Sequence, residues 1–212
     1  MPATPVLPQR TTAELTAHLD ELRAAPAEVG TVHLVARRPQ RFTRELLEEG
    51  VLDATDGLVG DNWYSRATSR AIAAGRHLDA QVTVMSARMV ALLSDDLEDQ
   101  AAAGDQLYVD LDISLTNLPT GSRLEFGEPG AGGAVIEVSA KPHNGCAKFT
   151  TRYGEEATAF VNSPAGRQLR LRGLNARVVE PGVVRRGDSV RVVRRGDQGD
   201  RAGTGAREAL AV

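Results

Sequence analysis

The chain has 212 residues, of which 42% are hydrophobic and 25% are charged, and its formal net charge at neutral pH is -3. These values are ordinary for a globular protein, and the length suits one well-packed domain better than two. A slightly acidic chain lacks the positive charge with which proteins bind nucleic-acid backbones, so we do not expect DNA or RNA as a partner.

Two further classes are not expected from the sequence. No apolar run approaches the roughly 20 residues that span a bilayer, and the first ten residues lack the pattern of a signal peptide. We therefore expect a cytoplasmic protein without a membrane partner. The chain has a single cysteine, Cys146, which excludes an intrachain disulfide and a zinc site built from several thiolates.

The first half of the chain predicts a helix, a strand and a second helix before a long loop. TTAELTAHLDELRAA places three leucines on one face of an amphipathic helix, which we assign to an N-terminal extension, residues 1–28. GTVHLVARRP alternates like a strand, and TRELLEEG predicts a short helix between Thr43 and Gly50. Residues 56–80 are polar and rich in glycine, and a loop of that length predicts a functional role.

The remaining pattern is dominated by short strands. QVTVM predicts a strand, followed by a helix in SARMVALLS that Ser86 caps. QLYVDLDIS alternates and predicts a strand with one face in water, RLEFG and GAVIEVSA predict a hairpin, GEEATAFVNS a helix, and RGLNARVV and DSVRVV two more strands. The fold class that follows is mainly β, a barrel or closed sandwich of mostly antiparallel strands with several short peripheral helices. We place this domain at residues 29–194 and predict a disordered tail at 195–212.

The stretch SAKPHNGCAKFTTRYG surrounds Cys146 with His143, Lys148 and Arg152. Positive charge and the start of a helix both favour a thiolate, which is the form that attacks electrophiles and binds metals. Free cysteines are also often buried as small apolar residues, so spacing alone leaves a reactive thiol and a core cysteine as alternatives.

Two segments carry a resemblance to a known family. HNGCAKFTTRYGEEATAFVNS and LRLRGLNARVVEPGVVRRGDSVRV closely resemble the C-terminal core of MOSC domains, the module at the end of molybdenum-cofactor sulfurases. DGLVGDNWYSR is similar to the Gly-Leu-x-Gly-Asp segment of that family, and GDQLYVDLDISLTNLPTGSRLEFG to its central strand pair. The chain resembles a stand-alone, bacterial-type member over roughly residues 29–194, and this implies a MOSC-type β-barrel.

The resemblance also implies chemistry. It implies a cleft for molybdenum-molybdopterin and assigns to Cys146 one of two roles, a carrier of persulfide sulfur or a ligand of molybdenum, with His143 and Lys148 as the other catalytic candidates. Proteins of this fold either deliver sulfur to the cofactor or hold it while they reduce N-hydroxylated compounds. A soft thiolate suits molybdenum.

A pterin cofactor carries a phosphate and polar ring edges, so its site should combine cations with amides. Seven residues outside the catalytic group are candidates for binding it: Arg66, Asp61, Gln106, Asn144, Arg152, Arg172 and Asn175. The alternative role for Asp61 is to cap a turn.

We expect separate proteins to supply the sulfur and the electrons that this chain cannot supply itself. It has no room for the pyridoxal-phosphate desulfurase domain of the longer sulfurases, so a separate cysteine desulfurase would supply any sulfur, and an external protein would supply electrons to reduce a small-molecule substrate. Two alternatives stay open: a non-redox module that binds another small anion in the same barrel, and an interaction protein with an inert cysteine.

Overall fold

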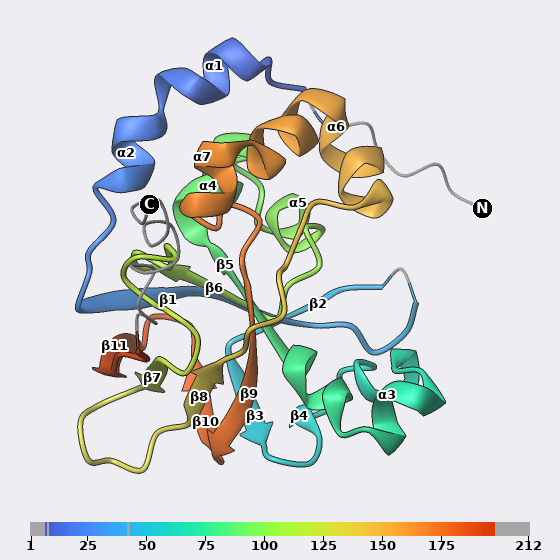
Figure 1. Ribbon diagram of the computed structural model, residues 1–212, viewed down its shortest axis with the longest axis vertical. Helices are drawn as coiled ribbons and strands as arrows, with labels where there is room; N and C mark the ends of the chain where they lie inside the picture. Colours follow the sequence, from blue (N-terminus) through green and yellow to red (C-terminus); the bar gives the residue numbers. More distant parts are fainter. Residues whose placement is uncertain (1–6, 8, 42, 198–212) are drawn as a thin grey trace, which may run out of the picture.

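The structure is a computed structural model that describes residues 7, 9–41 and 43–197, and it shows a β-barrel beneath a layer of helices (Figure 1). The strands are β1 (Val29–Arg37), β2 (Glu45–Leu47), β3 (Glu49–Asp53), β4 (Gly57–Leu58), β5 (Val82–Ser86), β6 (Leu107–Asp110), β7 (Arg123–Phe126), β8 (Val135–Val138), β9 (Leu174–Glu180), β10 (Gly182–Arg185) and β11 (Ser189–Arg194). The helices are α1 (Thr12–Ala17), α2 (Leu19–Arg23), η1 (Tyr64–Arg66), α3 (Ser69–Ala73), η2 (Arg76–Ala80), α4 (Ala87–Leu93), α5 (Leu97–Ala101), α6 (Ala147–Asn162) and α7 (Pro164–Gln168).

The barrel closes through seven strands in the order β1-β11-β7-β8-β9-β5-β6, with β6 returning to β1. Every pair in this ring is antiparallel except β5 and β6, which run parallel. β2 pairs with the last residues of β1, and β10, β3 and β4 form a small second sheet. The predicted fold class, a mixed and mostly antiparallel barrel with short helices, is confirmed.

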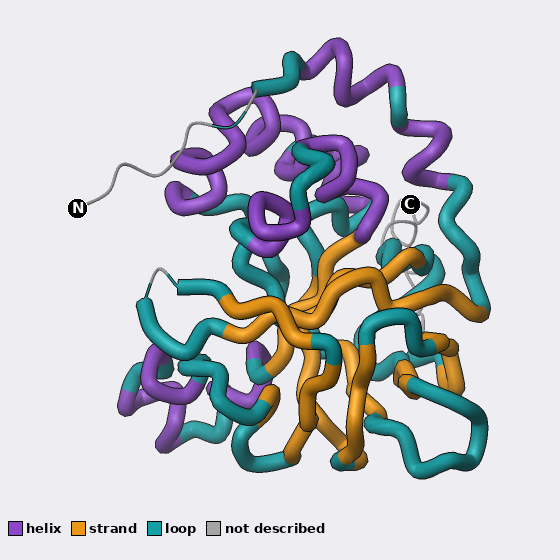
Figure 2. Tube along the Cα trace, turned by 180° about the vertical axis from the view of Figure 1, so that it is seen from behind, coloured by secondary structure: helices purple, strands orange, loops and turns teal. Residues whose placement is uncertain are grey.

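Two apolar cores lie on opposite faces of the same strands. Val84 of β5 and Val109 of β6 point into the barrel, whereas Met85 and Tyr108 point outward and are covered by helices. Because the residues of a strand alternate between faces, each of these strands is buried on both sides. Figure 2 shows most helices gathered over one end of the strands, with η1, α3 and η2 as a separate group beside the barrel.

Three local predictions were wrong, each for a tertiary reason. TRELLEEG forms β2 and the start of β3 because it pairs with β1 and β10, which overrides its helical pattern. The strand in QLYVDLDIS ends at Asp110 and has no exposed face, since Tyr108 packs in the helical core. The predicted N-terminal helix is divided at His18 into α1 and α2, although Leu15 and Leu22 are buried as expected.

The other predicted helices and strands are present in the structure, whereas the long loop predicted at residues 56–80 is only partly irregular, since it contains β4, η1, α3 and η2. Ser86 caps α4 by accepting a hydrogen bond from the Met89 N–H, and the predicted hairpin is β7 and β8. The predicted disordered tail lies outside the described residues from residue 198 onward, as do residues 1–6 and 8 of the proposed extension. Among the described residues, no helix combines the length and apolar character needed to cross a membrane.

Candidate functional site

The loop between β8 and α6 carries the cysteine and is fastened to the body of the protein at Gly145. The Gly145 N–H donates to Asn162 Oδ1 at 2.9 Å, and Asn162 Nδ2 donates back to the Gly145 carbonyl at 3.2 Å. A Cβ at position 145 would stand 2.9 Å from Asn162 Nδ2. A side chain at this position would therefore push the loop away from α6. Glycine allows the close contact, which places Cys146 directly before the first residue of the helix.

Cys146 is the N-cap residue of α6 and its side chain is exposed to solvent. Partial burial opposes ionisation of the thiol, but the backbone N–H groups of Phe149 and Lys148 and the charges of Arg172 and Lys148 outweigh this effect. The net result is a Cys146 pKa below the ordinary value of a thiol. The alternative of a buried core cysteine is thereby contradicted.

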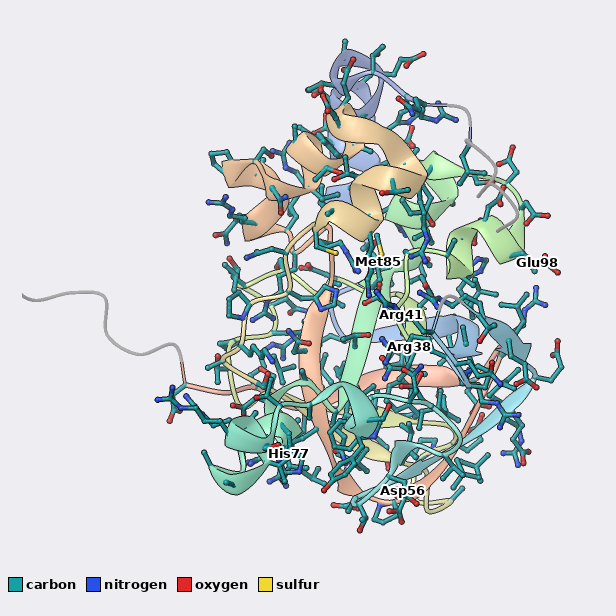
Figure 3. All side chains as sticks on the ribbon, turned by 90° about the vertical axis from the view of Figure 1, so that its right-hand side faces the viewer. Arg38, Arg41, Asp56, His77, Met85 and Glu98 are labelled. Atoms are coloured by element: carbon teal, nitrogen blue, oxygen red, sulfur yellow. The ribbon has the colours of Figure 1, made fainter. Side chains whose placement is uncertain are left out.

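The thiol opens onto a cavity of about 660 Å³ at the junction of the barrel with the helical layer. Six cationic residues line it, and no Asp or Glu of the described chain lies in its wall. The six are Arg38, Arg41, Arg44, Lys148, Arg152 and Arg172. We call this space the cationic cavity. In Figure 3, Arg38 and Arg41 lie together below the helices, and His77 lies farther down beside the barrel.

Several polar atoms of the wall lack a hydrogen-bond partner among the described residues. They are Arg44 Nε and Arg172 Nε, which are donors, Asn62 Oδ1, which is an acceptor, and Nε2 of His143; all four atoms are buried. Burial and the charge of Arg152 lower the pKa of Arg44 to about 10. Buried donors are normally paired, so these N–H groups and the surrounding charges fit an anionic ligand that also offers a donor to Asn62.

Two buried carboxylates hold the arginines from behind. Asp61 accepts hydrogen bonds from Nε and Nη2 of Arg38, at 2.8 and 2.7 Å, and its side chain is 0% exposed. Asp105 accepts from Arg172 Nη1 at 2.6 Å and is also 0% exposed. Burial opposes ionisation of Asp105, but the charge of Arg172 holds the pKa of this carboxyl below its ordinary value. The two carboxylates thus hold Arg38 and Arg172 in position but do not themselves line the cationic cavity.

Gln106 belongs to the same supporting layer. Its Oε1 accepts hydrogen bonds from the Thr83 N–H and hydroxyl, and its Nε2 donates to the Gln81 carbonyl and, at 3.5 Å, to Asp61. The residue is 0% exposed, so it lies behind the cavity wall. The predicted cofactor contacts of Gln106 and Asp61 would therefore act through Arg38.

His143 forms part of the wall and contacts Asn175 and Asp105 on its inner side. Its Nδ1 lies 3.3 Å from Asn175 Oδ1, and its Nε2 lies 3.3 Å from Asp105 Oδ1. Burial, followed by the charge of Arg172, lowers the pKa of His143 to about 4, against the opposing effects of Asp105 and Asn175. At neutral pH this imidazole is uncharged.

The structure brings most of the sequence-predicted residues together. His143, Asn144, Cys146, Lys148, Arg152 and Arg172 line the cationic cavity. Asn175 lines a neighbouring cavity of about 450 Å³, together with Trp63 and His77, whose rings stack. The side chain of Arg66 lies outside the described part of the chain.

Sequence reasoning missed Arg38, Arg41 and Arg44, which supply half of the cationic side chains of the wall, and it missed Asp105. The signal was present as four arginines at positions 37, 38, 41 and 44 of VARRPQRFTR. That cluster has the appearance of a solvated turn in the sequence, and only the fold turns it toward Cys146.

Comparison with known proteins identifies the family. The model of the MOSC domain matches residues 71–191, more than half of the chain. The chain therefore belongs to the MOSC domain family, which is known for binding the molybdenum cofactor. No curated protein matches the sequence significantly.

Solved structures share the fold at low sequence identity. The YuaD protein of Bacillus subtilis is 18% identical with a TM-score of 0.50, over 77% of this chain and 95% of that one. A hypothetical protein is 19% identical with a TM-score of 0.51, over 79% and 69% of the two chains. YiiM of Escherichia coli is 18% identical with a TM-score of 0.49, over 79% and 72%. At such identities the first two support the fold alone.

Proposed function

We propose that residues 29–194 form a MOSC domain that binds molybdenum-molybdopterin in the cationic cavity, with Cys146 Sγ as the protein ligand of molybdenum. The observation that carries this proposal is the exposed, readily ionised thiol at the edge of a wall with six cations and unpaired arginine N–H groups. The bound cofactor would supply redox chemistry at the metal, and thiolate sulfur is a soft ligand that suits it.

The residues of the wall divide into three roles in this proposal. Arg44 and Arg172 would hold the phosphate through their unpaired Nε–H groups, supported by Arg152 and Lys148, while Asn62 and Asn144 would contact the polar edges of the pterin. Asp61, Gln106 and Asp105 would keep Arg38 and Arg172 in place.

For the loaded protein we propose reduction of N-hydroxylated compounds, in which two electrons and two protons convert N–OH to N–H and water. The electrons would come from an external donor protein. A second role for Cys146 follows from the same exposed thiol, because a low thiol pKa also favours a persulfide that receives its sulfur from a separate cysteine desulfurase.

The test compares wild type with Cys146→Ser after expression in a host that makes the cofactor. Serine keeps the size of the side chain and removes the soft sulfur ligand. We expect molybdenum and pterin in the wild type, with molybdenum lost or strongly reduced in the variant. The loaded wild type, and not the variant, should oxidise a reduced dye when an N-hydroxylated compound is added.

Other outcomes assign other functions. Wild-type protein that carries one extra sulfur atom on Cys146 by mass spectrometry, but no molybdenum, would favour the persulfide carrier. Equal molybdenum content in both proteins, or none in either, would contradict ligation by Cys146. Unchanged binding of a small anion by the variant, without cofactor in either protein, would favour the non-redox module.

A further inference from the structure

The protonation state of His143 can be deduced from its neighbour Asn175. Nδ2 of Asn175 donates to the carbonyls of Lys141 and Pro142, at 3.1 and 3.2 Å, and two carbonyl oxygens can be matched only by the amide nitrogen. The amide oxygen of Asn175 therefore faces His143 Nδ1, 3.3 Å away. An oxygen acceptor requires a donor, so Nδ1 carries the proton of the neutral ring.

The opposite ring nitrogen then faces the wrong partner. With Nδ1 protonated, Nε2 of the neutral imidazole carries a lone pair, and it lies 3.3 Å from Oδ1 of the ionised Asp105. Both atoms are buried, and neither has a hydrogen-bond partner among the described residues. Two acceptors thus lie close together in the interior, and a proton on Nε2 would turn this contact into an ion pair with Asp105.

Burial is the main effect that disfavours this additional proton, and nearby positive charges add to it. Arg172 from the turn before β9 and Arg38 from the end of β1 both disfavour a charged imidazole, whereas Asp105 and the hydrogen bond to Asn175 favour it. Lys148 and Cys146 of the α6 segment line the same cavity. Because Arg172 and Arg38 oppose a positive charge on His143, negative charge that enters the cavity should make its protonation more favourable.

We propose that His143 and Asp105 form a proton-accepting pair, so that an anion entering the cationic cavity is bound together with one proton. The proton comes from solvent, forms an Nε2–H bond on His143, and is stabilised by the negative charge of Asp105, whose Oδ1 lies 3.3 Å from Nε2. It returns to solvent when the anion leaves. The pair holds a proton beside Cys146 only while the cavity is occupied.

This inference rests on the proposed function in one respect, that the cavity holds an anionic group. It goes beyond that function because it states that one histidine, His143, takes up a proton when the anion binds. By linkage, anion affinity rises about tenfold for each unit that the pH falls, between the pKa of His143 in the free and the bound protein.

Sulfate is a suitable probe because it stays divalent throughout the range in which His143 titrates. The experiment follows the Cε1–H resonance of His143 by NMR from about pH 4 to about pH 8, with saturating sulfate and with chloride at equal ionic strength. The protein carries Cys146→Ala, which removes the titration of the thiol. His143→Gln identifies the resonance, and His33, which does not line this cavity, is the internal reference.

We expect the pKa of His143 to rise from about 4 in chloride by about 1–3 units in sulfate, while His33 is unaffected. In calorimetry, sulfate should bind more tightly as the pH falls. His143→Gln places an amide N–H where Nε2 stands and should bind sulfate with pH-independent affinity. The matched variant His77→Gln, in the neighbouring cavity, should retain the pH dependence of its parent.

Three results would overturn the inference: a His143 pKa that saturating sulfate leaves unchanged, an ordinary pKa of His143 already in chloride, or no saturable binding of sulfate. All three are measured on protein without cofactor, so they are separate from the molybdenum content that tests the proposed function. Sulfate binding without proton uptake would leave the cofactor proposal intact and remove only the role of the pair.

Discussion

Cys146 differs from an ordinary surface cysteine in the groups that surround its sulfur. The N–H groups at the start of α6 and the charges of Arg172 and Lys148 stabilise the thiolate more than partial burial destabilises it. Lys148 is exposed, so its effect on the thiol is weakened by solvent and by salt. Arg172 is buried and fixed by Asp105, which makes it the permanent source of positive charge.

At neutral pH the native protein should therefore react with iodoacetamide faster than the same cysteine in the denatured chain. The rate should follow a thiol pKa below the ordinary value, because the lowered pKa increases the thiolate fraction. Lys148→Gln should move this pKa upward, toward that of the denatured protein. The measurement is the alkylation rate as a function of pH.

Lys141→Gln is the control, since Lys141 is exposed on the same loop but does not line the cationic cavity. An equal response of the rate to both substitutions would mean that net charge alone, and not the position of Lys148, determines the reactivity.

The turn that enters β9 shows how a backbone element places a functional residue. Gly173 has a φ of +111°, and its N–H donates to the Arg170 carbonyl at 2.7 Å. A Cβ at this position would stand 2.4 Å from the Val84 carbonyl oxygen of β5. Glycine therefore allows the turn to pack against β5, and the preceding residue, Arg172, enters the cationic cavity.

Gly173→Ala should lower the free energy of unfolding by roughly 2–5 kcal/mol, because backbone strain at positive φ and overpacking against β5 add together. Gly75→Ala is the matched control: Gly75 has a φ of +66°, and a Cβ there meets nothing within 4 Å. We expect that variant to lose only about 1–2 kcal/mol. Urea denaturation measures both, and equal losses would exclude the contact with Val84 as a cause.

On the scale of the whole molecule, two buried ion pairs join segments that are distant in sequence where the barrel meets the helices. Asp105 precedes β6 and pairs with Arg172, 67 residues later, while Arg38 follows β1 and pairs with Asp61. Removing one partner of such a pair leaves an uncompensated buried charge, whereas an exposed pair contributes little.

Asp105→Asn should accordingly lower the free energy of unfolding by about 3–5 kcal/mol near neutral pH. Asp110→Asn breaks the more exposed pair with Arg88 and should cost less than about 1 kcal/mol. The folded-state pKa of Asp105 is depressed, so its stabilising effect is present above about pH 4 and is lost as the pH falls through the folded-state value. Denaturant titrations across pH provide the measurement, and equal costs for the two variants would contradict the assigned difference in burial.

The pattern of the sequence was sufficient for most of the barrel and for the family. Alternation predicted β1, β9 and β11, because a residue's side of a strand depends only on its position along that strand, and short strand-like segments bounded by turns predicted β5, β7 and β8. The residues close to Cys146 in the sequence were sufficient to predict a cationic environment for the thiol, and the motifs around it were sufficient to predict the MOSC domain. These features depend on neighbours close in the chain.

Features set by distant segments required the tertiary structure. TRELLEEG is extended because β1 and β10 offer it strand partners, and Tyr108 is buried because helices cover that face of β6. Arg38, Arg41 and Arg44 join Cys146 in one wall, and Asp105 faces His143, only after the barrel has closed. Local spacing determines which face a side chain takes, but burial, charge and missing hydrogen-bond partners depend on what the rest of the chain places opposite it.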